Sequence, residues 1–463
     1  MSTNGSTSGP PSAPLTRRAV FAQSWPIMLA NALAPLVGLV DTFVIGRFAS
    51  TTALAGIGLG AVIYGIAYWG FGFLRMSTAG LAAQSDGAND EGALQAHLAR
   101  AVPLGLCIGA LIFALQTVLL AGAFKIYTAS GTIEGAAATY IAARLWGLPA
   151  TLGSIALMGW FVGISRAGRA LKMQIVLNVV NIILSPVFVI MFGWGLYGVA
   201  IASAIAEWIG LGAGLWLARG EIIKRGGLRK SALTKSALFE KDALSKLGVT
   251  NGNIFIRTMA LTLGFNFFGN AAASQGEVFL AGNHILMQFI TITALVLDSF
   301  AHTAEAVTGK AFGAKDKPRF TRAVRLTTEF SALFAVLAGV IIYFGGPVLI
   351  QALTHDPAVQ ESANRFLIYC AAAPVLGFAA WEMDGIFIGT TQSKEMRNAG
   401  VAAVVIYLLT HYGLLYVFPK VDAGHLLWAA FISWYVARAL TLGCYYPRVL
   451  RAMDGQAQSR ALA

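Results

Sequence analysis

The sequence predicts an all-α integral membrane protein with twelve transmembrane helices, arranged as two pseudo-symmetric six-helix lobes around a central cleft. Composition is the first observation behind this prediction: 57% of the 463 residues are hydrophobic and 12% are charged, whereas soluble domains carry about 25% charged residues. The apolar runs are the second, because they do not alternate in polarity and exceed the ~10 residues of a membrane β-strand. The distribution of basic residues is the third.

Twelve apolar runs of about 20 residues or more are each long enough to cross a bilayer as a helix. Several exceed the thickness of the hydrocarbon core, so we expect these helices to tilt or to project into the cytoplasm. The predicted spans cover residues 19–46, 53–84, 96–122, 133–164, 170–192, 195–219, 248–274, 278–310, 320–346, 359–390, 396–419 and 424–447.

The basic residues predict the orientation of these helices. An even number of spans puts both termini on one side, and most Lys and Arg residues lie in the tails and loops of that side, whereas the opposite loops hold only Arg47, Lys125 and Lys420. The positive-inside rule therefore places both termini in the cytoplasm. It also accounts for the formal net charge of +12 without a nucleic-acid partner.

Two short motifs recur and indicate an internal duplication. "GAND" at 87–90 returns as "GAKD" at 313–316, and "FVG" at 161–163 returns as "FIG" at 387–389, each 226 residues later. Because each half contains an even number of spans, the two halves insert in the same orientation, related by an axis along the membrane normal. The expected parts are a disordered tail (1–16), a first lobe (17–219), a basic cytoplasmic linker (220–247), a second lobe (248–450) and a C-terminal tail (451–463).

Signatures of an enzyme are absent from the sequence. It contains no GxSxG, Walker A or HExxH motif, and its three cysteines lie in apolar segments without the spacing of a metal site. We therefore expect no catalytic activity, no cofactor and no metal. Without an ATP-binding motif, transport through this chain would be driven by an ion gradient or would be passive.

Asp41 is the most informative residue in the sequence, because it lies at the centre of the apolar run "LVGLVDTFVIG". A charged residue at the centre of a spanning helix costs roughly 2.5–3.5 kcal/mol, and such residues mark functional sites. A carboxylate removed from water favours its protonated form, so it can take up a proton outside and release it inside. Pro35 can kink the same helix. We interpret Asp41 as an ion-coupling residue, with a structural hydrogen-bonding role as the alternative.

The run "QIVLNVVNIILSP" supplies polar partners for this carboxylate. Asn178 and Asn181 lie three residues apart and therefore on one helix face. They could bind Asp41 or a substrate, or they could join helices by hydrogen bonds. Pro186, at the end of the run, is expected to bend the helix.

Ionisable residues at membrane depth also occur in the second half. Asp298, His302 and Glu305 are spaced by four and three residues, which places them on one helix face. Asp384 lies in "WEMDGIFIG", and Arg257 is the candidate that neutralises one of these acids. A proton relay and a structural ion pair are both compatible with this pattern.

The assembled motifs resemble the multidrug and toxic compound extrusion (MATE) family, and within it the DinF-like branch. The strings that carry the resemblance are "GLVDTFVIG", "FLRMSTAGLAAQSDGA", "NVVNIILSP", "VLDSFAHTAEAVTGKAFGA" and "DGIFIGTTQSKEMRN", in order along both halves. The resemblance implies a two-lobed exporter that exchanges protons or sodium for amphipathic, often cationic, drugs.

The resemblance also implies roles for single residues. Asp41 matches the family's first-helix coupling carboxylate, Asn181 a polar partner of that carboxylate, and Asp384 an acid used by other branches in the second lobe. Ser185, which we expect to be a further polar partner of Asp41, stands where many DinF-like relatives have a second Asp, so a two-carboxylate site is not available in the first lobe. The seventh helix also lacks the acid found in sodium-coupled branches.

We therefore predict a monomeric antiporter of the bacterial inner membrane that exports amphipathic, mostly cationic drugs or toxins in exchange for protons. Sodium coupling is one alternative. A flippase for lipids or lipid-linked sugars on the same architecture is the other.

Overall fold

The computed structural model describes residues 15–48, 50–127, 129–234 and 239–461, and in this part of the chain the regular structure is helical. The predicted disordered tail lies, apart from Leu15 and Thr16, outside the described residues. The helices of the first half are α1 (Arg17–Leu33), α2 (Leu36–Phe48), α3 (Thr51–Gly70), α4 (Phe73–Gly87), α5 (Glu91–Ala114), α6 (Gln116–Ile126), α7 (Gly131–Arg144), η1 (Leu145–Gly147), α8 (Leu148–Gly163), α9 (Ala167–Pro186), η2 (Val187–Met191) and α10 (Gly195–Lys224).

The second half contains longer, less interrupted helices. A short 3₁₀ turn, η3 (Lys230–Leu233), lies in the linker. It is followed by α12 (Lys241–Ala273), α13 (Glu277–Gly313), α14 (Lys317–Leu353), α15 (Pro357–Gly389), α16 (Ser393–Val417) and α17 (Ala423–Ala461). Helix α17 continues through most of the segment 451–463, for which the sequence suggested a tail.

The predicted fold class is confirmed. Each of the twelve predicted spans coincides with one to three consecutive helices. In the described residues, ten helical stretches are long and apolar enough to cross a membrane by length and composition. The span predicted at 53–84 is divided between α3 and α4, and the first span between α1 and α2. The break after α1 falls at Ala34 and Pro35, where proline supplies no backbone N–H. Pro186 ends α9, and the chain continues as the π-helical turn η2.

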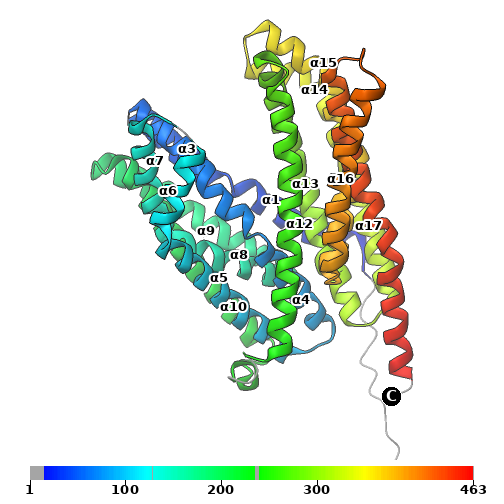
Figure 1. Cartoon of the computed structure of the whole chain (residues 1–463). Coiled ribbons are helices and arrows are strands. Elements are labelled where there is room, and N and C mark those ends of the chain that lie inside the picture. Colours follow the sequence, from blue (N-terminus) through cyan, green and yellow to red (C-terminus); the bar gives the residue numbers. More distant parts are fainter. Residues whose placement is uncertain (1–14, 49, 128, 235–238, 462–463) are drawn as a thin grey trace, which may run out of the picture.

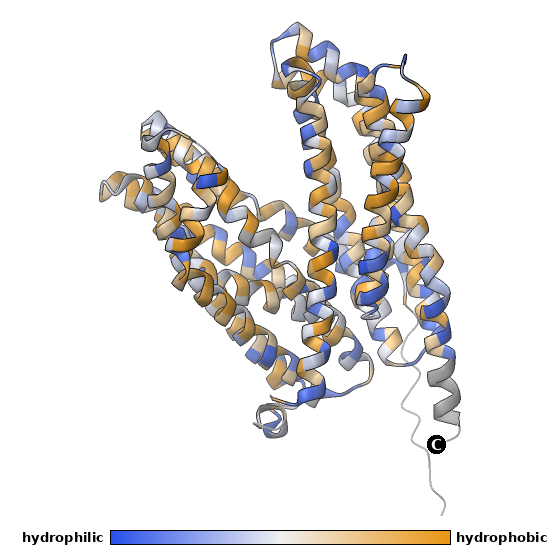
Figure 2. Cartoon of the chain, in the orientation of Figure 1, coloured by the Kyte–Doolittle hydropathy of each residue, from blue (hydrophilic) through white to orange (hydrophobic). Residues whose placement is uncertain are grey.

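The helices form two bundles, α1–α10 and α12–α17, which lie close together near the end where α4 stops and diverge toward the opposite end (Figure 1). Apolar residues predominate along the helices of both bundles (Figure 2). Large aromatic side chains fill the interiors, among them Trp160 and Phe161 in the first bundle and Trp428 and Trp434 in the second. Many large hydrophobic side chains are exposed, such as Phe344 on α14, which is 74% exposed. A protein surrounded by lipid tails requires such a surface.

The backbone repeats with the offset found in the sequence. Within the described ranges, four non-glycine residues have positive φ, and they form two pairs 226 residues apart: Asn89 (57°) with Lys315 (56°), and Ser165 (58°) with Thr391 (55°). Each follows the end of a helix, and the next amide reaches back to close the turn, as in Asp90 N to Ser85 O (2.9 Å). Left-handed residues at this position satisfy the last helical carbonyls. The duplicated halves therefore keep the same helix-ending turns.

The repeated motifs meet at a contact between the bundles, which we call the seam. It joins the ends of α4 and α13: a Cβ on Gly87 would overlap the Lys310 carbonyl, and a Cβ on Gly313 would overlap the Gln84 carbonyl. Lys310 also forms an ion pair with Asp86 (2.6 Å). Because glycine has no side chain, it lets the two backbones approach this closely.

The seam generates the first prediction. Gly313→Ala should lower the free energy of unfolding by about 1–3 kcal/mol, because the added methyl group would overlap backbone atoms that cannot rotate away. Thermal unfolding of the detergent-solubilised protein measures this loss. Gly443→Ala on α17 is the control, since no atom lies within 4 Å of the added Cβ. Equal stability of the two variants would contradict the assigned packing.

Candidate functional site

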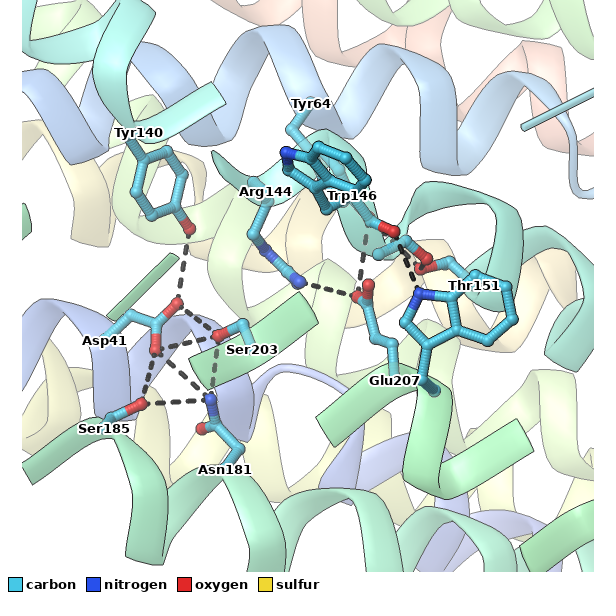
Figure 3. Close-up of polar contacts among 12 residues, drawn as sticks. Asp41, Tyr64, Tyr140, Arg144, Trp146, Thr151, Asn181, Ser185, Ser203 and Glu207 are labelled. Atoms are coloured by element: carbon cyan, nitrogen blue, oxygen red, sulfur yellow. Dashed lines mark hydrogen bonds and ion pairs between the residues drawn. The ribbon is translucent and has the colours of Figure 1, made fainter. Parts of the chain in front are cut away.

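Asp41 lies in the interior of the first bundle, on α2, and is fully buried. Its carboxylate accepts hydrogen bonds from Ser203 Oγ (2.9 Å to Oδ2 and 3.1 Å to Oδ1), Tyr140 OH (3.3 Å) and Ser185 Oγ (3.3 Å), with a longer contact from Asn181 Nδ2 at 3.4 Å (Figure 3). Four donors around one carboxylate compensate for the water it has lost.

Three other helices position these donors. Asn181 and Ser185 are one turn apart on α9, Ser203 lies on α10 and Tyr140 lies on α7. Ser203 also accepts from Asn181 Nδ2 at 2.8 Å, so the donors are themselves connected. Asn178 is buried on the same helix, but its amide donates to Gln174 O (2.8 Å), and no hydrogen bond joins it to Asp41. Thus the structure brings Asn181 and Ser185 to Asp41, as the sequence predicted, but not Asn178.

A second polar layer lies one helical turn from the first. On α7, Arg144 follows Tyr140 by four residues, and on α10, Glu207 follows Ser203 by four residues. Arg144 Nη1 and Glu207 Oε1 form a buried ion pair at 2.7 Å, and Figure 3 shows the Arg144 side chain between Asp41 and Glu207. Tyr64 OH completes the layer with a 3.4 Å contact to the same Glu207 oxygen.

The sequence analysis missed Tyr140, Ser203 and the pairing of Arg144 with Glu207. Spacing offered a signal for them: the pairs 140/144 and 203/207 place polar groups on one face of each helix. No local pattern in the sequence, however, predicts that these faces of α7 and α10 both turn toward Asp41.

The Asp41 shell, formed by Ser203, Ser185, Tyr140 and Asn181, contains groups that can donate hydrogen bonds and groups that can accept them. The hydroxyl groups of Ser203, Ser185 and Tyr140 can donate to a carboxylate, and each can instead accept from a protonated carboxyl group. The buried Asn181 Oδ1 has no hydrogen-bond partner among the described residues. The shell can therefore satisfy Asp41 in either protonation state.

The second bundle holds its carboxylate differently. Asp384 Oδ2 on α15 accepts hydrogen bonds from Arg257 Nη2 on α12 and from Arg438 Nη2 on α17, the latter at 2.8 Å. Arg438 also lies 5.7 Å from the ring centroid of Tyr435. Guanidinium groups only donate hydrogen bonds, so neither partner of Asp384 can accept one from it. Asp384 and Arg257 meet as the sequence suggested, and they lie in a different bundle from Asp41.

Asp298, His302 and Glu305 share the face of α13 that is turned toward the first bundle. Glu305 pairs with Arg75 of α4 at 3.0 Å across the two bundles. Asp298 and His302 are half-buried, and neither makes a hydrogen bond with a described residue. The hydroxyls of Thr303 and Ser24 on α1 are 2.8 Å apart on this side of α13. The spacing in the sequence placed these residues correctly on one face, and the structure shows which neighbour that face meets.

The described residues contain no group of three or more His, Cys, Asp or Glu side chains that could hold a metal ion. Asp41, the neighbouring hydroxyls and the Asn181 carbonyl oxygen offer oxygen atoms to a monovalent cation.

The buried layer of Arg144 and Glu207 generates the second prediction. Arg144→Gln should reduce stability by about 3–5 kcal/mol, because it leaves a buried carboxylate without its counter-ion. The double variant Arg144→Gln/Glu207→Gln should recover much of that loss, since it removes both charges. Thermal unfolding of these two variants and of the single variant Glu207→Gln completes a double-mutant cycle. If the losses of stability in the two single variants add up to the loss in the double variant, the pair does not interact.

Comparison with known proteins agrees with this architecture. A family model described as MatE matches the chain twice, at residues 26–187 and 254–417, once in each half. The "DNA damage-inducible protein F" of Escherichia coli strain K12 is 33% identical over 431 residues, covering 93% of this chain and 92% of that protein. A "Probable multidrug resistance protein NorM" of Aromatoleum aromaticum is 24% identical over 368 residues, covering 76% and 75% of the two chains.

Solved structures show the same fold. "Crystal structure of MATE in the bent conformation" superposes with a TM-score of 0.85 at 17% identity, covering 95% of this chain and 97% of that one. A MOP superfamily transporter from Pyrococcus furiosus, whose description reports a reverse polarity of its binding pocket, superposes with a TM-score of 0.80 at 19% identity over 94% and 96%. The matches in both halves, together with the close bacterial relative, show that this chain belongs to the MATE family of multi-pass membrane transporters.

Proposed function

We propose that this transporter works as a monomer in the bacterial inner membrane and exports amphipathic, mostly cationic organic compounds in exchange for protons. Asp41 is the residue that takes up and releases the proton. The observation that carries this proposal is the hydroxyl shell of Asp41, which can donate to the ionised group and accept from the protonated one. Asp384 is instead held by two guanidinium groups, which donate hydrogen bonds but cannot accept one.

Charge balance in the first bundle supports the uptake of one proton in each cycle. Asp41 and Glu207 are two buried carboxylates, and Arg144 is the cation between them (Figure 3). With both acids ionised, this interior carries one excess negative charge, which is costly away from water. One proton on Asp41 makes the interior neutral while the Arg144–Glu207 pair stays intact. Protonation of Asp41 therefore sets the net charge of the group formed by Asp41, Arg144 and Glu207.

Helices α1 and α2 connect Asp41 to the contact between the two bundles. Asp41 lies on α2, and the break at Ala34 and Pro35 joins α2 to α1. On its other side α1 contacts α13 of the second bundle, where Ser24 meets Thr303 (2.8 Å) and Asn31 Nδ2 donates to Ser299 Oγ (3.3 Å). We infer that a change in the hydrogen bonds of Asp41 alters the packing of α2, and that α1 carries this change to the contact between the lobes.

The positive-inside rule orients this movement. It places the seam at the cytoplasmic side with both termini, so the described arrangement is closed to the cytoplasm and diverges toward the exterior (Figure 1). The lobes at 17–219 and 248–450, joined by the linker at 220–247, would separate at the seam to open inward. Substrates would then pass between the bundles.

Asp298 supports a preference for cationic substrates. It is half-buried on the face of α13 turned toward the first bundle, and no hydrogen bond occupies it among the described residues. The guanidinium groups of Arg75, Arg257 and Arg438 act on this carboxylate. We infer that it also attracts organic cations that enter between the bundles. Relatives named as probable multidrug resistance proteins agree with exported compounds of this kind.

The third prediction concerns coupling. In liposomes with separately imposed proton and sodium gradients, the protein should move a cationic dye in response to the proton gradient. Asp41→Asn should abolish this response, because an amide cannot exchange a proton. Asp422→Asn, an equivalent change at an exposed ion pair near the start of α17, serves as the control and should retain transport.

Proton-driven transport undiminished by Asp41→Asn would remove Asp41 from the mechanism. A response to sodium alone would favour the sodium-coupled alternative. Lipid scrambling without any movement of dye would favour the flippase.

The fourth prediction concerns substrate charge. Asp298→Asn should lower the transport of a monovalent cationic dye about tenfold, and it should change the transport of a neutral compound of similar size by less than about twofold, because only the cation loses an attraction. Transport rates of the two compounds in the same liposomes give the comparison. An equal loss for both compounds would indicate a structural role for Asp298.

A further inference from the structure

An open groove of about 890 Å³ lies on the first bundle, between the start of α9 and the end of α10. Basic side chains line it from both helices: Arg166, Arg169 and Lys172 on one side, Arg219 and Lys224 on the other. The proposed mechanism uses none of these residues. The groove is also well separated in the chain from the seam motifs and from Asp41.

The groove has a strong excess of positive charge. Buried Glu221 neutralises part of it, pairing with Arg166 (3.0 Å) and Arg169 (2.8 Å). The other three basic side chains are exposed and form no ion pair with a described residue: Lys172, Arg219 and Lys224. The five basic groups of the lining outnumber this one carboxylate, so the groove is suited to an anionic group that presents several oxygen atoms.

The surroundings of the groove are those of a membrane interface. Helices α9 and α10 both cross the membrane, and the groove lies where these spans end. Trp216 and Ile223 belong to its lining and are 72% and 60% exposed. Tryptophan is enriched at the level of lipid headgroups, and exposed isoleucine is favourable beside acyl chains. No neighbouring atom lies within 4 Å of a Cβ placed on Gly168, so this part of the lining is unfilled.

We propose that this groove binds the headgroup of an anionic phospholipid. The phosphate oxygens would meet Lys172, Arg219 and Lys224, and the acyl chains would extend along Trp216 and Ile223. Basic pockets between spans on the cytoplasmic side are suited to headgroups of this charge. The apolar part of the lining favours a lipid over a soluble phosphate, which would leave Trp216 and Ile223 exposed.

The test uses the full-length protein in nanodiscs, with lipid retention measured by native mass spectrometry after mixing phosphatidylglycerol and phosphatidylcholine in equal amounts. The groove variant is Lys172→Gln/Arg219→Gln/Lys224→Gln, which leaves the ion pairs of Glu221 in place. The control, Lys241→Gln/Lys394→Gln/Arg451→Gln, removes the same charge from exposed positions outside the groove. Thermal unfolding in pure phosphatidylcholine verifies that both variants are folded.

Wild type and control should retain phosphatidylglycerol preferentially, and the groove variant should lose this preference by roughly 10- to 100-fold, given the contribution of each basic residue near an anionic surface. Equal retention by the groove variant and the control would overturn the proposal. The proposal would also be overturned if inorganic phosphate, added to the protein in phosphatidylcholine nanodiscs, raised its thermal stability as much as phosphatidylglycerol does. Retention is measured without transport, so the result is independent of the role of Asp41.

Discussion

The constraint on which the interior of the first bundle depends is the burial of one carboxylate at membrane depth. Asp41 is fully removed from solvent, and helices α7, α9 and α10 each supply at least one donor to it. A single helix in a bilayer cannot satisfy such a group, so the surrounding helices must pack in one particular register. The hydrogen bonds that compensate Asp41 are therefore also the ones that join α2 to the rest of its bundle.

The two halves share a backbone plan but differ in their polar interiors. The helix-ending turns at Asn89 and Lys315 are equivalent, and so are those at Ser165 and Thr391. Inside, the first bundle surrounds its carboxylate with groups that both donate and accept, whereas the second clamps Asp384 between Arg257 and Arg438. The duplicated halves therefore share a backbone plan, but their side chains differ: the partners of Asp41 can donate and accept hydrogen bonds, and those of Asp384 only donate.

Contacts between the bundles concentrate at the seam and along α1. At the seam, glycines bring the ends of α4 and α13 together, and the Lys310–Asp86 ion pair crosses from one bundle to the other. Nearer the start of α4, the Arg75–Glu305 pair also crosses. Along α1, hydroxyl and amide groups form hydrogen bonds with α13. At its exposed start, Arg17 also forms an ion pair with Glu329 of α14 (2.8 Å). Neutral hydrogen bonds exchange partners more readily than tightly packed backbones separate. In the proposed mechanism, α1 therefore transmits a change at Asp41, and the seam is the contact that opens.

The sequence by itself predicted the twelve spans and the duplication with its offset of 226 residues, and it singled out Asp41 as a charge at membrane depth, since hydropathy, spacing and charge are local properties. Helical spacing also placed Asp298, His302 and Glu305 on one face. Only the tertiary structure decided that Tyr140 and Ser203 complete the Asp41 shell, that Arg144 pairs with Glu207, and that Arg438 joins Arg257 on Asp384. These partners come from helices far apart in the chain, and which helix faces meet depends on packing across the whole bundle.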